Sequence, residues 1–303
     1  IDQCRINSID FNSACFTNLS LDHLDYHNSL ENYSNVKFSL FKNILPMDRA
    51  SVICTESKEG KDFSKALKLL NKKTMEIGKN SEFINIESVK KYDSGNEVEI
   101  TFQGEPFKFI LGFAPYFQIL NILCAAGLAI VSGCNYKEVF SVLEKIEPVK
   151  GRYEIIKSNN YSNIIIDYAH TPEALSYVLR DIKKESTGKV VLVFGCGGSR
   201  DQSKRPLMGR VAEKYCDEII ITNDNPRDED PSLIADQILK GCPKARVILD
   251  RAEAIKCGIS KIKNNDVLLI AGKGHEETQT IGNHINPFSD RDVIRSFCEA
   301  SNE

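Results

Sequence analysis

Charged and amide side chains stand in a row where one predicted strand ends. The apolar run 218–222 leads into Asp224, Asn225, Pro226 and Arg227. Asp, Asn and Pro favour turns for local reasons, so an ordinary solvated loop is one interpretation. An anion, an amide and a cation in sequence also suit a ligand that carries both charges, such as a free amino acid. A motif of this length does not decide between the two.

Three further predicted strands, at 163–167, 189–195 and 266–272, end in or near loops that are rich in glycine or charge. Their candidate functional residues are Asp167, His170, Arg200, Gly272, Lys273, His275 and Glu276. FGCGG lacks the spacing of a dinucleotide-binding loop, and its glycines are better explained by tight turns. A single histidine such as His275 is more often structural than catalytic. Four such loops at one edge of a parallel sheet nevertheless predict a binding crevice there.

The elements that must position these loops alternate between apolar strands and helices from residue 163 onward. This pattern indicates a doubly wound α/β domain, in which ligands bind at the carboxyl ends of parallel strands. The first half is a mixed α/β region, with strands expected at 13–19 and 50–56, a meander at 83–112, and helices at 30–43, 61–77, 116–132 and 136–145. Pro148 disfavours a helical residue before it, so we expect domains at 1–148 and 149–303.

Composition narrows the class of protein. The chain is 42% hydrophobic and 27% charged with a net charge of −3, which is typical of a globular protein and gives no reason to expect nucleic acid or an anionic membrane as partner. No apolar run reaches the length of a membrane span. Ten scattered cysteines without a CxxC pair predict reduced thiols in a cytoplasmic protein rather than disulfides or zinc. The chain does not begin with Met, so we expect that it is part of a longer protein.

A second polar cluster follows the first predicted strand. Asp22, His23, Asp25 and His27 lie close together in sequence, and Lys37 follows on a predicted helix. A polar turn and a solvated helix face are the simplest interpretations. The cluster could also serve a divalent metal, although Mg²⁺ prefers oxygen ligands to histidine.

Several strings taken together resemble the Mur ligases, the ATP-dependent amino-acid ligases of peptidoglycan synthesis. The strings occur in the family's order and are TNLSLDHLDYH, GRYE, DYAHTPEAL, FGCGGSRDQSKRPLMG, DNPR and AGKGHEETQ. They are most similar to the MurE type, which adds the third residue of the stem peptide to UDP-N-acetylmuramoyl-L-alanyl-D-glutamate. The resemblance covers nearly the whole chain.

The resemblance implies a fold of two α/β parts. Residues 1–148 would be part of the central ATPase-type domain, and residues 149–303 the Rossmann-like domain that carries the incoming amino acid. GxxxxGK[ST] is not found in the sequence. We therefore expect that the 303 residues alone do not turn over ATP. The implied reaction has two steps: ATP phosphorylates the substrate carboxylate, and the amine of the amino acid then displaces phosphate, with Mg²⁺ neutralising the oxyanions.

The resemblance also implies roles for single residues. It places meso-diaminopimelate against Arg200, Asp224, Asn225, Pro226, Arg227, Gly272 and Glu276. It places the nucleotide dipeptide against Gln3 and Arg5, and ATP against Asn121, Arg152 and Asp167. His23 would be associated with the metal, and Lys37 would bind it as a carbamate (N6-carboxylysine). One departure is Ser199, which stands where the family usually has Asp.

Two alternatives remain beside a diaminopimelate-adding ligase. The lysine-adding ligase would be expected to lack the arginine of DNPR, and Arg227 is present. A non-catalytic amino-acid-binding module would need no phosphate loop. The sequence does not indicate a partner chain.

Overall fold

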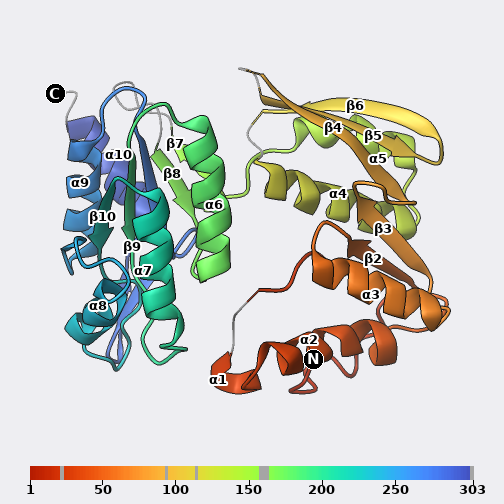
Figure 1. Ribbon diagram of the computed structural model, residues 1–303, viewed down its shortest axis with the longest axis horizontal. Helices are drawn as coiled ribbons and strands as arrows, with labels where there is room; N and C mark the ends of the chain where they lie inside the picture. The colour runs from red at the N-terminus through yellow and green to blue at the C-terminus, as the bar shows by residue number, and fades with distance from the viewer. Residues whose placement is uncertain (21–23, 93–94, 113–114, 157–163, 301–303) are drawn as a thin grey trace. The chain divides into compact units, whose positions relative to one another are not determined.

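A computed structural model describes the chain except for residues 21–23, 93–94, 113–114, 157–163 and 301–303 (Figure 1). The chain divides into two compact units. The first contains Ile1–Ser20 and Tyr26–Glu147, and the second includes Pro148–Glu303. No helix in the described ranges is both long enough and apolar enough to cross a membrane.

The first unit is built on a six-stranded sheet whose strands follow in chain order. These are β1 (Ser13–Phe16), β2 (Ala50–Cys54), β3 (Thr74–Gly78), β4 (Ile84–Tyr92), β5 (Gly95–Phe102) and β6 (Glu105–Leu111). Strands β1 to β4 are parallel, and β4 to β6 form an antiparallel meander. The helical segments are α1 (Leu24–His27), α2 (Leu30–Ser39), η1 (Leu40–Ile44), α3 (Lys58–Leu69), α4 (Tyr116–Val131), α5 (Tyr136–Ser141) and η2 (Leu143–Lys145).

Two apolar clusters cover the faces of this sheet. Ile119 and Leu123 of α4 pack with strand residues such as Ile77 on one side. Phe63 and Leu67 of α3 belong to a second cluster, which also contains strand residues of β1 and β2. Helix α4 is apolar along most of its length, and the residues that it buries include Ile119 and Leu123.

The expected helix at 61–77 is wrong in its second half. Helix α3 ends at Leu69, and Asn71 takes a left-handed conformation with φ 54°. The chain then enters β3, which pairs with β2 and β4 in the sheet. The helical pattern of the preceding residues masks this short strand, because pairing with two neighbours outweighs local propensity.

The second unit is a doubly wound domain, as predicted. Its sheet has the order β11-β10-β9-β12-β8-β7, and all pairs are parallel except that of β7 with β8. The strands are β7 (Glu154–Ile156), β8 (Ile164–Asp167), β9 (Val190–Phe194), β10 (Glu218–Ile221), β11 (Arg246–Val247) and β12 (Val267–Ala271). The sequence missed β7, and β11 is only two residues long.

Helices cover both faces of this second sheet (Figure 1). They are α6 (Pro172–Glu185), α7 (Lys204–Tyr215), α8 (Pro231–Leu239), α9 (Arg251–Lys261) and α10 (Asp290–Ala300), and the hairpin β13 (Thr278–Ile281) with β14 (His284–Pro287) precedes the last of them. Local signals fix the helix starts: Thr171 caps α6 and Asp250 caps α9 through their side-chain oxygens. From β9 the chain runs to β10 and β11 on one side, while β12 and β8 lie on the other. In sheets of this kind, ligands are expected to bind at the carboxyl ends of the strands where the direction changes.

Candidate amino-acid-binding site

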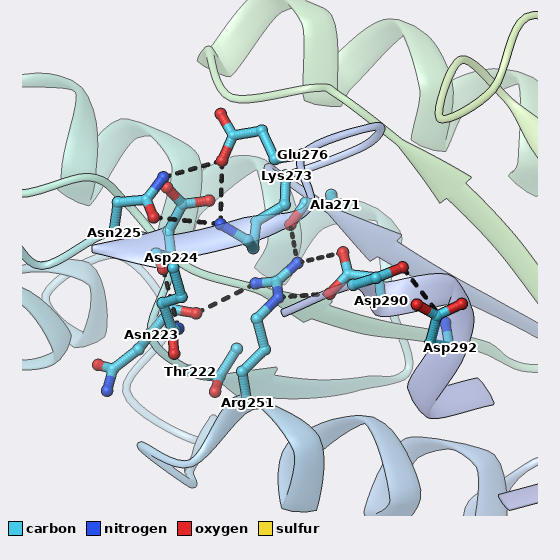
Figure 2. Close-up of polar contacts among 12 residues, drawn as sticks. Thr222, Asn223, Asp224, Asn225, Arg251, Ala271, Lys273, Glu276, Asp290 and Asp292 are labelled. Atoms are coloured by element: carbon cyan, nitrogen blue, oxygen red, sulfur yellow. Dashed lines mark hydrogen bonds and ion pairs between the residues drawn. The ribbon is translucent and has the colours of Figure 1, made fainter. Parts of the chain in front are cut away.

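A buried lysine joins the loops that follow β10 and β12. The Lys273 side chain is fully buried, and its Nζ donates to Asn225 Oδ1 at 3.1 Å and to Glu276 Oε2 at 2.9 Å. Asn225 Nδ2 donates to the same Glu276 oxygen at 2.9 Å, so the three side chains form a closed triangle (Figure 2). Burial raises the pKa of Glu276, but the hydrogen bonds from Lys273 and Asn225 outweigh it and hold that pKa below its usual range. Glu276 is therefore a fixed anion.

Asp224 is the second carboxylate of the site, in a different environment. Among the described residues no donor forms a hydrogen bond with its half-buried carboxyl group. Burial raises its pKa, although the charges of Arg251 and Lys273 oppose the rise. A Cβ on Gly272, whose φ is +112°, would lie 2.7 Å from Asp224 Oδ2, so this position requires glycine. A carboxylate with unused acceptor capacity between two loops is suited to an ammonium group.

Arg227 ties its loop to two neighbouring segments. Its Nη1 donates to the carbonyl oxygen of Gly198 at 2.8 Å and to that of Asn225 at 3.4 Å. Its backbone N–H donates to Thr280 O, and its carbonyl accepts from Gly282 N, at 3.1 and 2.7 Å. The residue is half-buried and takes a left-handed conformation with φ 52°. One guanidinium nitrogen is thus engaged with the backbone, and the DNPR segment is more than a solvated turn.

The loops after β9 and β10 touch through their backbones. Gly198 N donates to Asn225 O at 2.9 Å, and a Cβ on Gly198 would lie 1.8 Å from the carbonyl oxygen of the buried Pro226. A side chain at Gly198 would therefore separate the loops. This contact explains the glycine pair in the sequence by close approach, as well as by turning.

A partly buried ion pair fixes the loop after β9, which carries the exposed Arg200. The fully buried Arg205 binds Glu229 with two hydrogen bonds of 2.7 and 3.0 Å and donates to Gly197 O at 3.0 Å. Glu229 in turn accepts the backbone N–H of Ser199. The serine at 199 does not prevent the loop from being ordered, because its backbone N–H makes this contact.

Asp167, the last residue of β8, forms hydrogen bonds with two backbone N–H groups. Its two oxygens accept the N–H groups of Tyr153 and Ala169, each at 2.7 Å. Burial raises its pKa, and these hydrogen bonds offset part of the rise. The neighbouring Arg152 is exposed and lies over the ring of Tyr168, 4.3 Å from its centroid. The predicted roles of Asp167 and Arg152 toward ATP stay predictions.

The remaining predicted residues belong to the first part of the chain. Gln3, Arg5 and Asn121 are exposed, and His23 lies outside the described residues. Lys37 is in the last turn of α2, with its Nζ 4.8 Å from the centroid of the Tyr33 ring. In the described ranges no group of three or more His, Cys, Asp or Glu side chains is arranged to hold a metal ion. The Mg²⁺ ligands therefore also stay predictions.

Sequence reasoning did not assign three charged residues at this sheet edge. The sequence places Lys273 in a candidate loop but predicts no contact for it, whereas its Nζ organises Asn225 and Glu276. No pattern in the sequence indicates Arg251 or Asp290, yet both are buried, and Arg251 contacts the backbone of the residues that precede Asp224 and Gly272 (Figure 2). A basic residue after a capping aspartate reads as an ordinary helix start, so the sequence carried no signal for Arg251.

Comparison with known proteins defines the class. The model of the Mur ligase middle domain matches residues 1–129, and that of the Mur ligase glutamate ligase domain matches residues 151–274. The two matched domains account for most of the chain in the same order as its two units. The chain therefore belongs to the Mur ligase family.

Curated relatives share more than a third of the sequence. The UDP-N-acetylmuramoyl-L-alanyl-D-glutamate--2,6-diaminopimelate ligase of Rhizobium meliloti (strain 1021) is 38% identical over 296 residues, which cover 97% of this chain and 61% of the relative. The ligase of the same name from Rickettsia montanensis is 41% identical over 299 residues, or 97% of this chain and 62% of the relative. The chain thus spans about three fifths of the length of these relatives.

Solved structures agree with this assignment. A structure of a UDP-N-acetylmuramoyl-L-alanyl-D-glutamate--2,6-diaminopimelate ligase matches with a TM-score of 0.59 and 31% identity, covering 100% of this chain and 63% of that one. MurF from Acinetobacter baumannii matches with a TM-score of 0.71, 17% identity, and coverage of 96% and 60%. At that identity the second match shows the fold alone.

Proposed function

We propose that this chain is the catalytic and amino-acid-binding part of a ligase that adds meso-diaminopimelate to UDP-N-acetylmuramoyl-L-alanyl-D-glutamate. The observation that carries the proposal is the junction of the DNPR loop with the loop after β12, where Asn225, Lys273 and Glu276 are hydrogen-bonded together beside Asp224. The curated relatives named for this reaction match 97% of the chain.

The charges of this site suit a diamino acid with two carboxylates. Glu276 is held ionised, and Asp224 has unused acceptor capacity, so each can take an ammonium group. Arg227 has one nitrogen engaged with backbone carbonyls, which leaves the rest of its planar fork for a carboxylate. Arg200 is exposed on the adjoining loop and would add a second cation for the other carboxylate.

The proposed reaction makes an amide bond at the expense of ATP. The carboxylate of the nucleotide dipeptide takes the γ-phosphoryl group of ATP and releases ADP. The neutral amine of the amino acid then attacks the acyl phosphate, and phosphate and one amine proton leave as the amide forms. The second unit's part is to bind and orient the amine, because attack requires a near-attack geometry. Mg²⁺, when bound, would neutralise the gathered phosphate and carboxylate oxygens.

The proposal assigns further roles in keeping with the family. Gln3 and Arg5 would contact the nucleotide dipeptide, and Asn121, Arg152 and Asp167 would contact ATP. A bare ammonium at Lys37 would repel Mg²⁺, whereas a carbamate on the same nitrogen is an anionic oxygen ligand, so Lys37 would act in that form together with His23. ATP and the nucleotide substrate are cytoplasmic compounds, so the reaction is assigned to the cytoplasm.

The test is a ligation assay of the full-length protein with meso-diaminopimelate and with L-lysine. Lysine lacks the distal carboxylate and leaves a partly desolvated arginine unpaired. A mismatch of this kind costs about 1–3 kcal/mol, or roughly fivefold to more than a hundredfold in kcat/KM. Arg227→Ala should raise the KM for diaminopimelate. It should also reduce the preference for diaminopimelate over lysine, mainly because diaminopimelate is then bound less tightly.

Three outcomes distinguish the alternatives. Preference for diaminopimelate supports the proposal. Equal or preferred use of lysine would identify a ligase of different specificity. It would also show that Arg227 only holds its loop in place and does not select the substrate. Binding of an amino acid without ligation, under conditions where a relative's enzyme is active, would favour a non-catalytic module.

A further inference from the structure

A buried arginine spans the two strand ends that carry the amino-acid site. Arg251, the first residue of α9, donates from Nη1 to the carbonyl oxygen of Asn223 and from Nη2 to that of Ala271, both at 3.2 Å (Figure 2). Asn223 directly precedes Asp224, and Ala271 directly precedes Gly272. Because β9 lies between β10 and β12 in the sheet, these two strand ends are not neighbours and share no ladder hydrogen bonds. Arg251 supplies a direct link between them.

Asp290 completes this link. Its two oxygens accept from Arg251 Nε at 2.7 Å and from Nη2 at 2.8 Å, in the paired geometry that orients a guanidinium. Both side chains are fully buried. The paired charges hold the pKa of Arg251 above its usual range even though burial opposes this. Asp290 begins α10, so the last helix of the described chain fixes the arginine that contacts both loops.

Stability alone is a poor explanation for such a pair. Desolvation of a buried ion pair offsets most of its attraction, and a well-packed apolar pair of similar volume is often as stable or more so. An apolar pair, however, could not donate hydrogen bonds to the two carbonyl oxygens. What Arg251 adds to the loop contacts is a direct tie between the carbonyl oxygens of Asn223 and Ala271, the residues that precede Asp224 and Gly272.

We propose that Arg251 and Asp290 are positioning residues, which hold the strand ends at Asn223 and Ala271 at the separation that the amino-acid site requires, without contacting the substrate. The inference rests on the proposed function, because it assigns the ligand of this site to the incoming amino acid. Loss of the pair releases the strand ends at Asn223 and Ala271 from each other, although the loop contacts of Asn225 with Lys273 and Glu276 remain. Amino-acid binding therefore weakens, while the binding of ATP and of the nucleotide dipeptide is retained.

The experiment compares the full-length protein with the double variant Arg251→Met/Asp290→Leu and the single variant Asp290→Asn. The apolar pair fills the space and restores packing, but it cannot form the hydrogen bonds to the carbonyl oxygens of Asn223 and Ala271. We expect the double variant to keep a melting temperature near that of the unaltered protein and to show at least a tenfold rise in KM for the amino acid. The KM values for ATP and the nucleotide dipeptide should change less than twofold. Asp290→Asn keeps one acceptor for Arg251 and should show a smaller rise of the same selective kind.

A matched control lies on the same helix. Lys256 and Glu253 of α9 form an ion pair whose side chains are 43% and 61% exposed, and Lys256→Met/Glu253→Leu makes the same chemical change on the surface. This control should leave all three KM values unchanged. An unchanged KM for the amino acid in the folded Arg251→Met/Asp290→Leu protein would overturn the proposal, as would an equal rise for all three substrates. If the double variant does not fold, the same criteria apply to Asp290→Asn.

The design separates this inference from the proposed function. The unaltered protein first identifies which amino acid is ligated. If that amino acid is not diaminopimelate, the proposed specificity fails, but the variants are then compared with the amino acid that is used. A selective rise in its KM would still support the positioning role.

Discussion

Removal of the Lys273 ammonium tests whether the triangle of Lys273, Asn225 and Glu276 organises the site. Lys273→Met keeps the length of the buried side chain but removes two hydrogen bonds, at 3.1 and 2.9 Å. Hydrogen bonds to charged groups are worth about 1.5–3 kcal/mol each, and loss of one member of a buried pair costs about 3–5 kcal/mol. The Glu276 side chain is 31% exposed and keeps the donor of Asn225, so water relieves part of this cost. We therefore expect a loss of about 2–4 kcal/mol in the free energy of unfolding, with Glu276 no longer held in place.

Two measurements check this expectation. Urea denaturation should show a lower midpoint for Lys273→Met. Calorimetric titration with diaminopimelate should show an affinity reduced by roughly tenfold to a hundredfold, since loss of one well-placed contact to the charged Glu276 is worth about 1.5–3 kcal/mol. Lys244→Met, at an exposed loop lysine, is the control and should change neither quantity. A Lys273→Met protein that is as stable as the unaltered one and binds the amino acid equally well would refute the reasoning.

Three further predictions concern other charged groups. Asp224→Asn should raise the melting temperature above neutral pH, because burial raises the pKa of Asp224 and its ionised form destabilises the folded state once pH rises through that pKa. The affinity for diaminopimelate should fall in the same variant, and a lower stability of the variant at pH 8 would contradict the assignment. Glu229→Gln should lower the stability at neutral pH, because the hydrogen bond from Arg205 holds the pKa of Glu229 below its usual range. In urea titrations, the difference in stability between the variant and the unaltered protein should vanish as pH falls through that lowered pKa. Lys37→Ala should abolish ligation in the full-length protein, with partial recovery in a high concentration of a short carboxylic acid; near-normal turnover without that acid would exclude a carbamate ligand.

The sequence predicted the doubly wound domain because its signals are local and repeated. Four apolar strands each lead to a loop with polar or glycine residues, and parallel pairing then brings those loops to one edge whatever the details of packing. The contact of Asn225 with Glu276 could therefore be anticipated as proximity, though not as a hydrogen bond. The triangle with Lys273 could not, because a lysine in a glycine-rich loop gives no sign in the sequence of whether its side chain is buried.

The errors have identifiable physical causes. Strand β3 was missed because its residues continue a helical pattern, and only pairing with β2 and β4 defines it. The partnership of Arg251 with Asp290 joins positions 39 residues apart, and no spacing rule relates the start of one helix to the start of another. The backbone contacts of Asp167 were also not anticipated: both of its oxygens accept N–H groups, while its predicted contact with ATP stays a prediction.

The attachment of the DNPR loop to the hairpin that follows it has a consequence for exchanging specificity between relatives. Arg227 shares two backbone hydrogen bonds with Thr280 and Gly282, Asn225 Oδ1 accepts from Thr280 N, and Gln279 Nε2 donates to Asp224 O. A chimera that receives only the DNPR segment would have to form these contacts with a foreign hairpin. Segments 222–229 and 276–288 therefore form one transplantable unit, and recombination points for domain or loop exchange should be chosen outside both rather than between them.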